Sequence, residues 1–290
     1  MKHLGFCCEM QNGIQIYWTF LNRPAPLSSN TTGFEALPNL WRDVLIFSLF
    51  FSAIFMIVKS FTSRVLIHKF QKINERKRSE LPSYVLCLIH HMVAVPFAWQ
   101  NIYHDFNLSS DEVKSIDYAP ITSIIAPWCI AYLIVDTIFY AIPEAINWKF
   151  EYILHHSLTL FLVVSSLLAP GSILRFIPHL LISDTTNIFF NFAWLLRLFG
   201  GGGTYLLVFL ELSFAASFLL IRAINMPCMF WALGSQAEGL GYARFALVPI
   251  ALMQWYWLCK IIRGVSGRFT VGAVSSESKI RDPERQKKQL

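Results

Sequence analysis

The sequence predicts an all-α protein that crosses a membrane several times, as a polytopic bundle of about seven transmembrane helices. Of its 290 residues, 55% are hydrophobic and only 14% are charged, whereas a soluble domain carries about 25% charged residues. The mean hydropathy is +0.48. Apolar stretches also recur at about the 20-residue length that an α-helix needs to cross a bilayer. Together these observations exclude an ordinary water-soluble domain.

Seven stretches are long and apolar enough to be transmembrane helices. Their expected ranges are 44–63, 84–103, 119–142, 150–169, 173–199, 204–222 and 244–262. The fifth stretch is the most polar of the seven. Residues 223–242 are interrupted by Pro227 and three glycines, so a loop or a re-entrant segment is expected there.

The expected helices divide the chain into five segments. These are an N-terminal lumenal segment (1–43), a first transmembrane helix (44–63), a basic cytosolic loop (64–83), a six-helix membrane domain (84–262) and a basic cytosolic tail (263–290). The net charge of +6 is concentrated between Lys59 and Arg78 and after Lys260. Because these clusters flank apolar spans, they are interpreted as topology signals, and no nucleic-acid partner is expected.

The charges of the short loops predict the orientation of the helices. The loop after the first helix is rich in lysine and arginine, which favours the cytosolic side, whereas the next loop, 105–117, is acidic. Counting through seven helices then places the N-terminus in the lumen and the C-terminus in the cytosol. Glycosylation sequons begin at Asn30 and Asn107, and both fall on the predicted lumenal side.

The last four residues carry a candidate sorting signal. Lys287 and Lys288 stand fourth and third from the end, a pattern that resembles the dilysine retrieval signal of endoplasmic reticulum membrane proteins. Such a signal is bound by a retrieval coat in the cytosol, where the predicted topology places it. We therefore expect a multi-pass protein of the endoplasmic reticulum membrane, with a simple solvated basic tail as the alternative.

Polar side chains recur at one expected depth in the membrane. With a rise of about 1.5 Å per residue, His155 and His156 lie roughly 8 Å inside the cytosolic end of the fourth helix, and His90 and His91 lie about as deep in the second. Other members of this layer are Asp136, Asn191, Glu211 and Gln254. Because such groups are costly against lipid, they should face inward and pair. The sequence therefore predicts a buried polar chamber.

The residue types in this layer suit acid–base or nucleophilic chemistry. A carboxylate beside an imidazole fixes its tautomer and raises its basicity, so His155 or His156, oriented by Asp136 or Asp184, is a candidate general base or nucleophile. Asp184 is expected deeper, with His179 and Arg175 as candidate partners.

Other interpretations of these polar residues remain open. Histidine, asparagine and glutamine also form hydrogen bonds between helices without any catalytic role. No metal site is expected, although a haem or zinc ion bound by the four histidines of the layer is an alternative. The six cysteines lack zinc-site and disulfide spacing and are interpreted as small apolar residues.

One series of polar motifs runs from His155–Thr159 through Ser165-Ser166 and Arg175 to Ile182–Phe189. This series resembles the Lag motif of the TLC-domain family, which includes the ceramide synthases. Further segments that resemble the family are Ala131–Asp136, Asn187–Trp194 and Phe218–Arg222. The resemblance covers about 84–262, and it is greater for the smaller TLC-domain proteins than for the ceramide synthases.

The resemblance implies an activity and a set of site residues. In ceramide synthases the double histidine and a downstream acidic pair are held to carry acyl transfer from acyl-CoA to a sphingoid amine, which implicates His155, His156 and Asp184. This chain has Asn187 where ceramide synthases have the second aspartate, and Ser183 where they have a histidine. Asn187 and Arg222 are expected to line the same chamber.

Two alternative functions are therefore considered, both in lipid metabolism or homeostasis. One is a ceramide synthase-like N-acyltransferase with acyl-CoA and a lipid amine as substrates and no cofactor. The other is a non-catalytic protein that binds membrane lipids and shapes membrane composition or trafficking. A seven-helix receptor is disfavoured, because no Asp-Arg-Tyr sequence follows the third expected helix.

The predicted orientation can be tested with tags at the two ends of the chain. In sealed microsomes an N-terminal tag should be protected from added protease, whereas a C-terminal tag should be digested. The reason is that basic loops stay in the cytosol, which places the N-terminus in the lumen and the C-terminus in the cytosol. Detergent should expose both tags. Protection of the C-terminal tag would contradict the assignment.

Overall fold

The computed structural model describes residues 37–66, 75–107, 124–168, 176–235 and 245–280. Every element in these ranges is helical, and they contain no β-strand. Five of the described helical segments are long and apolar enough to cross a membrane: Asn39–Arg64, Glu75–Tyr103, Ala126–Ile146, Phe150–Leu167 and Tyr205–Trp231. The expected all-α membrane bundle is confirmed.

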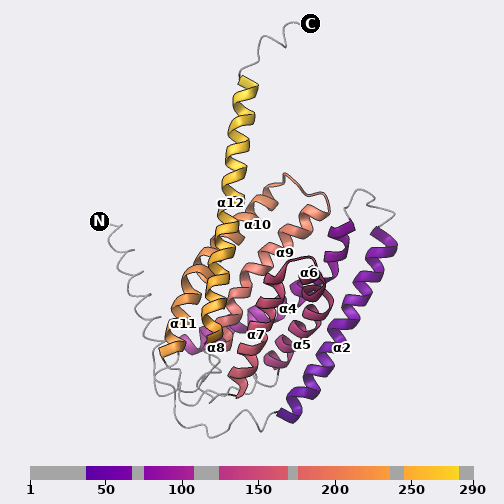
Figure 1. Cartoon of the computed structure of the whole chain (residues 1–290), viewed down its shortest axis with the longest axis vertical. Helices are drawn as coiled ribbons and strands as arrows, with labels where there is room; N and C mark the ends of the chain where they lie inside the picture. Colours follow the sequence, from indigo (N-terminus) through magenta and orange to yellow (C-terminus); the bar gives the residue numbers. More distant parts are fainter. Residues whose placement is uncertain (1–36, 67–74, 108–123, 169–175, 236–244, 281–290) are drawn as a thin grey trace, which may run out of the picture.

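The first helix, α2 (Leu37–Phe61), continues into a π-helical turn, η2 (Thr62–Leu66). It packs against α4 (Glu75–Asn107) and α5 (Ala126–Asp136) at one side of the bundle (Figure 1).

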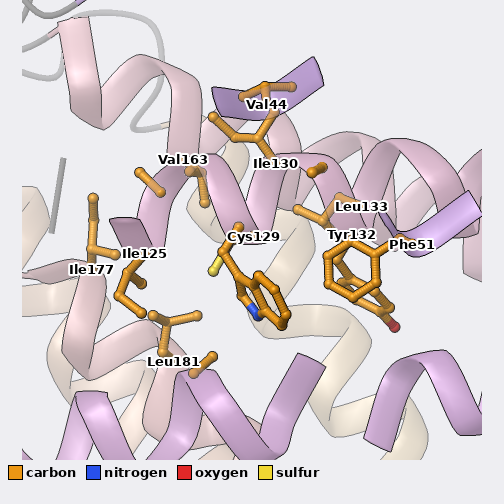
Figure 2. Close-up of a cluster of buried hydrophobic side chains, with 14 of the residues drawn as sticks. Val44, Phe51, Ile125, Cys129, Ile130, Tyr132, Leu133, Val163, Ile177 and Leu181 are labelled. Atoms are coloured by element: carbon orange, nitrogen blue, oxygen red, sulfur yellow. The ribbon is translucent and has the colours of Figure 1, made fainter. Parts of the chain in front are cut away.

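Aromatic side chains fill the interface between α2 and α5 (Figure 2). Phe51 is fully buried, and its ring centroid lies 4.6 Å from that of Trp128 and 5.9 Å from that of Tyr132. The outward side of α2 is also apolar, with Leu49 and Ile57 about two-thirds exposed. An apolar outer surface is what contact with lipid requires, and close packing then holds the helices together.

Helix α4 begins at Glu75, earlier than the expected residue 84, so the second half of the expected basic loop is helical. Arg76 pairs with Glu80 one turn later at 3.1 Å and reaches Glu144 of α6 at 3.4 Å. Glu144 is also paired with Lys149. These contacts stabilise a charged helix end outside the apolar span, where hydropathy alone carries no helix signal. Residues 67–74 of the same loop lie outside the described residues.

Two of the long helices contain π-helical segments. Helix α5 runs through η5 (Thr137–Ala141) into α6 (Ile142–Ile146), and α10 (Tyr205–Ser217) runs through η8 (Phe218–Asn225) into α11 (Met226–Ser235). Residues 223–235, expected to be a loop or a re-entrant segment, therefore extend the sixth helix. Pro227 directly follows the π-helical segment η8, and local π-helical adjustment accommodates a proline inside a membrane helix.

Helix α7 (Phe150–Leu168) coincides with the fourth expected helix. The fifth is broken into α8 (Phe176–Leu181), a 3₁₀ turn η7 (Ile182–Asp184) and α9 (Thr185–Leu198). The turn between α9 and α10 uses Gly200 and Gly203 at φ of 86° and 82°, which side chains with a Cβ atom rarely adopt.

Helix α12 (Leu247–Ile280) is longer than the expected range 244–262, and its C-terminal part projects beyond the other helices (Figure 1). The expected tail is thus helical as far as Ile280. Residues after Arg263 are mostly small or polar, which suits a helix that has left the bundle.

Candidate functional site

A cavity of about 450 Å³ lies inside the bundle. Its walls come from α4, α5, η5, α7, α8, η7, α9, α10, η8, α11 and α12, so most of the long helices contribute. Its polar lining residues include Ser83, Cys87, His90, His91, Asp136, His155, His156, Ser183, Asp184, Asn187, Asn191, Arg222 and Gln254. Most of the predicted polar layer thus surrounds one space.

The two rings of each double histidine point in different directions, because adjacent residues of an α-helix are about 100° apart around the helix axis. On α4, His91 faces Asp184, whereas His90 stacks on Tyr132 with ring centroids 4.1 Å apart. On α7, His156 faces Asp136, whereas His155 lies edge-on to Trp257 at 5.1 Å. Each pair therefore supplies one imidazole to a carboxylate and one to an aromatic ring.

The first imidazole–carboxylate pair joins α7 to the end of α5. His156 Nε2 lies 3.5 Å from Asp136 Oδ2, and its Nδ1 lies 3.3 Å from the Thr137 hydroxyl. Ser83 Oγ donates to Asp136 Oδ1 at 2.5 Å. Thr137 is the first residue of the π-helical segment η5, and such segments are frequent at functional sites.

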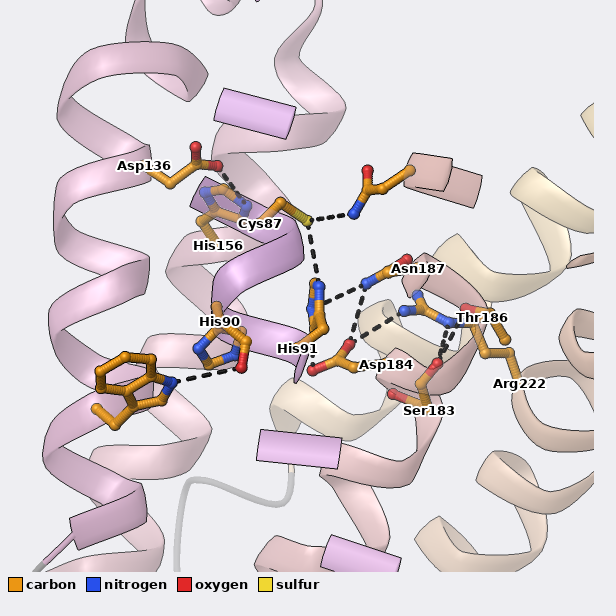
Figure 3. A network of polar contacts seen from close by, with 12 residues as sticks. Cys87, His90, His91, Asp136, His156, Ser183, Asp184, Thr186, Asn187 and Arg222 are labelled. Carbon is orange, nitrogen blue, oxygen red and sulfur yellow. Dashed lines mark hydrogen bonds and ion pairs between the residues drawn. The ribbon is translucent and has the colours of Figure 1, made fainter. Parts of the chain in front are cut away.

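The second pair, shown in Figure 3, is centred on Asp184 at the 3₁₀ turn of the fifth helix. His91 Nε2 lies 3.5 Å from Asp184 Oδ2. Asp184 Oδ1 accepts from Arg222 Nη2 at 3.2 Å and from Asn187 Nδ2 at 3.1 Å. The Asn187 Nδ2 atom also lies 3.3 Å from His91 Nε2. The Asp184 carboxylate is thus held by three side chains.

Arg222 reaches this carboxylate from the π-helical segment η8. Its Nε donates to the Ser183 carbonyl at 3.0 Å, and its Nη1 donates to Gln254 Oε1 at 3.3 Å. Arg222 is only 3% exposed. Because a buried unpaired charge is strongly destabilising, the stability of the bundle requires these partners for the guanidinium.

A thiol belongs to the same network. Cys87 Sγ lies 3.3 Å from His91 Nδ1 and accepts from Asn191 Nδ2 at 3.1 Å (Figure 3). Sequence reasoning treated Cys87 as an apolar residue and missed this role. The available signal was its spacing, because residues i and i+4 of a helix share a face and Cys87 stands four residues before His91.

Three polar atoms of the site lack a hydrogen-bond partner within the described ranges. They are His90 Nδ1, His155 Nδ1 and Gln254 Nε2. All three residues line the cavity, so a molecule bound there is the candidate partner for these enclosed atoms.

The structure places some predicted residues elsewhere. Glu211 does not line the cavity and is instead paired with Arg197 of α9 near the surface. Asp184 pairs with His91 and Arg222 rather than with His179 on its own helix. Asn107 is the last residue of α4. The predictions for Arg175, Asn30, Lys287 and Lys288 lie outside the described residues.

One group of donors in the site could hold a metal ion. Ligand atoms of His90, His91 and Asp184 lie within 4.8 Å of one another. However, the Arg222 guanidinium lies 3.2 Å from Asp184, so a divalent ion would face a positive charge beside one of its three ligands. The group is better explained as an ion-pair network, and no metal is assigned to it.

A comparison with protein-family models finds the TLC domain over residues 81–263. The match begins in α4 and ends in α12, so it contains every residue of the cavity described above. Neither curated proteins nor solved structures gave a match.

Removal of Arg222 should strongly destabilise the bundle. In Arg222→Met the Asp184 carboxylate would lose its cation, and we expect a loss of about 3 kcal/mol. Arg197→Met, which breaks the more exposed pair with Glu211, should cost under about 1 kcal/mol. Thermal unfolding of the purified variants in detergent would measure both. A double variant with Asp184→Asn should recover part of the loss, and equal effects of the two single variants would contradict this account.

Proposed function

Because the chain belongs to the TLC-domain family of membrane proteins, we propose that it is an acyltransferase that moves an acyl chain from acyl-CoA to a lipid amine. The observation that carries this proposal is the cavity itself. Two imidazole–carboxylate pairs and two histidines with an unpartnered ring nitrogen line one space inside a membrane bundle. Acyl transfer requires a group that takes a proton from the acceptor, and imidazole suits that task near neutral pH.

The contacts of the two histidines on α7 suggest different roles. Both ring nitrogens of His156 have partners, Asp136 and Thr137, so this ring is fixed in place. His155 Nδ1 has no partner within the described ranges and lies beside the cavity. We assign His155 as the general base that accepts the proton of the lipid amine, and His156 with Asp136 as its positioning partners.

The walls of the cavity fit the two substrates. Its volume of about 450 Å³ falls in the range of about 300–1,000 Å³ typical of ligand pockets. Leu162, Val163 and Ile177 supply apolar walls for an acyl chain. Lys260 also lines the cavity and is half-exposed, paired with Glu151 at 3.2 Å. A cation at the rim suits the phosphates of CoA.

A specific observation favours the alternative of a non-catalytic lipid-binding protein. Both oxygens of Asp184 are already engaged by His91, Arg222 and Asn187, so this network is largely satisfied without a substrate. A satisfied polar network can hold a lipid head group and stabilise the bundle without turnover. The two functions differ in whether CoA is released.

Location in the endoplasmic reticulum, with the N-terminus in the lumen, is part of the proposal. It is supported by the basic loop after the first helix and by Lys287 and Lys288 near the C-terminus. In Lys287→Ser/Lys288→Ser we expect the tagged protein to leave the endoplasmic reticulum for later compartments, because the retrieval coat would lose its signal. Fluorescence microscopy against organelle markers tests this, and an unchanged distribution would exclude the dilysine signal.

The proposed activity can be tested with purified protein in proteoliposomes. Palmitoyl-CoA and a panel of lipid amines should yield free CoA and one amide-linked lipid class. His155→Ala should lower that rate by about 100-fold or more, the typical contribution of a general base. Asp43→Asn, on α2 away from the cavity, is the matched control and should retain the wild-type rate. Absence of CoA release from the wild type with every amine would favour the non-catalytic alternative.

A further inference from the structure

We infer that Cys87 is the nucleophile that first receives the acyl chain, as a thioester, with His91 as its base and Asp184 as the residue that orients His91. This inference rests on the proposed acyltransferase function and adds a covalent intermediate to it. Neither the resemblance to ceramide synthases nor the family match assigns a role to a cysteine.

The three side chains lie in the order that nucleophilic catalysis requires. His91 stands between the thiol and the carboxylate, with Nδ1 3.3 Å from Cys87 Sγ and Nε2 3.5 Å from Asp184 Oδ2. With the Nε2 proton held toward Asp184, the Nδ1 lone pair faces the thiol and can take its proton. A nucleophile, a base and a group that orients the base form the general arrangement of catalytic triads.

Neighbouring residues stabilise the charges that this proton transfer would create. Asn191 Nδ2 lies 3.1 Å from the sulfur and can donate to a thiolate. Arg222 and Asn187 hold Asp184 from its other side. A thiolate next to a protonated imidazole and an amide donor is in the electropositive surroundings that make cysteine reactive.

Independent evidence for a bound molecule comes from unpartnered polar atoms in the same cavity. Gln254 is fully buried and His90 is 2% exposed, yet Gln254 Nε2 and His90 Nδ1 have no hydrogen-bond partner within the described ranges. Buried polar groups in folded proteins are nearly always satisfied. Both residues line the cavity together with Cys87, so a polar ligand in that cavity would supply the partners that they lack.

Exposure and position together separate Cys87 from the other three cysteines of the described chain, because Cys228 is also partly buried but does not line the cavity. Cys87 is half-buried and lines the cavity, so a substrate can reach its sulfur. Cys129 lines the same cavity but is 2% exposed. Cys259 is exposed on α12 outside the cavity lining. The latter two are therefore natural controls for reactivity.

The reaction balances in two steps. The Cys87 thiolate attacks the carbonyl carbon of the acyl-CoA thioester, a new carbon–sulfur bond forms, and the bond to the CoA sulfur breaks. The CoA thiolate leaves with the proton that His91 took from Cys87. In the second step the lipid amine attacks the Cys87 thioester and loses a proton to His155. The Cys87 thiolate leaves as its carbon–sulfur bond breaks, and the proton that His155 accepted from the amine returns to it. Both residues regain their starting forms, so no oxidant or metal is required.

The intermediate can be trapped with palmitoyl-CoA and no acceptor. Purified protein in detergent should gain the mass of one palmitoyl group, and peptide mapping should place it on Cys87. Neutral hydroxylamine should release it, as expected for a thioester. Cys87→Ser should lose the adduct, whereas Cys129→Ser and Cys259→Ser should keep it. His91→Gln keeps the thiol and should slow acylation by about 100-fold or more.

The outcomes distinguish this inference from the function on which it rests. In His155→Ala/His156→Ala the Cys87 adduct should form and persist even when a lipid amine is added. Steady amide formation with the adduct on His155 or His156, or undiminished turnover in Cys87→Ser, would overturn the inference and leave the acyltransferase function intact. Acylation of Cys259 as fast as Cys87 would indicate spontaneous exchange and would also overturn it. No CoA release from the wild type with any acceptor would overturn both.

Discussion

The ion pair between Asp184 and Arg222 is the interaction on which the rest of the site depends. A bilayer offers no water to a charged side chain, so each charge in the bundle must find a partner inside the protein. Arg222 meets this need with a carboxylate and a backbone carbonyl of the fifth helix and with a side-chain amide of α12. The 3₁₀ turn at Ile182–Asp184 brings both Asp184 and the Ser183 carbonyl to the same guanidinium. Packing of η8 against the fifth helix and against α12 is therefore linked to the geometry of the cavity.

In each double histidine, the two adjacent rings have different surroundings. Because neighbouring side chains diverge around the helix, His91 and His156 reach carboxylates while His90 and His155 contact aromatic rings and keep a free ring nitrogen. The fixed imidazoles belong to polar networks that connect helices. The unpartnered ones face the cavity, where a bound molecule can use them. Their adjacency in sequence therefore does not imply a shared function.

Asn187 decides the charge balance of the centre. In ceramide synthases, which the chain resembles, a second carboxylate occupies this position. Here the neutral amide donates to Asp184 and contacts His91, so Arg222 has one carboxylate to neutralise. His91 is then shared between Asp184 and the Cys87 thiol. This chain therefore combines an amide at position 187 with a thiol–imidazole contact between Cys87 and His91 on α4. The combination fits the proposed cysteine chemistry better than a mechanism that uses only a double histidine.

The sequence by itself determined the fold class and most of the apolar spans, because each is a property of hydropathy along one helix. It also led to His155, His156, Asp136 and Asp184. Continuation of helices past the apolar spans was missed at Glu75 and beyond Arg263, since charged helix ends outside lipid have no hydropathy signal.

Only the tertiary structure decided which side chains meet. It joined Asp184 to His91 and Arg222 instead of His179, turned Glu211 outward to Arg197, and brought Cys87 to His91 and Asn191. The physical reason is that the rotation of each helix about its axis is set by packing against its neighbours. Depth along a helix can be read from the sequence, whereas the direction in which a side chain points across the bundle depends on that packing.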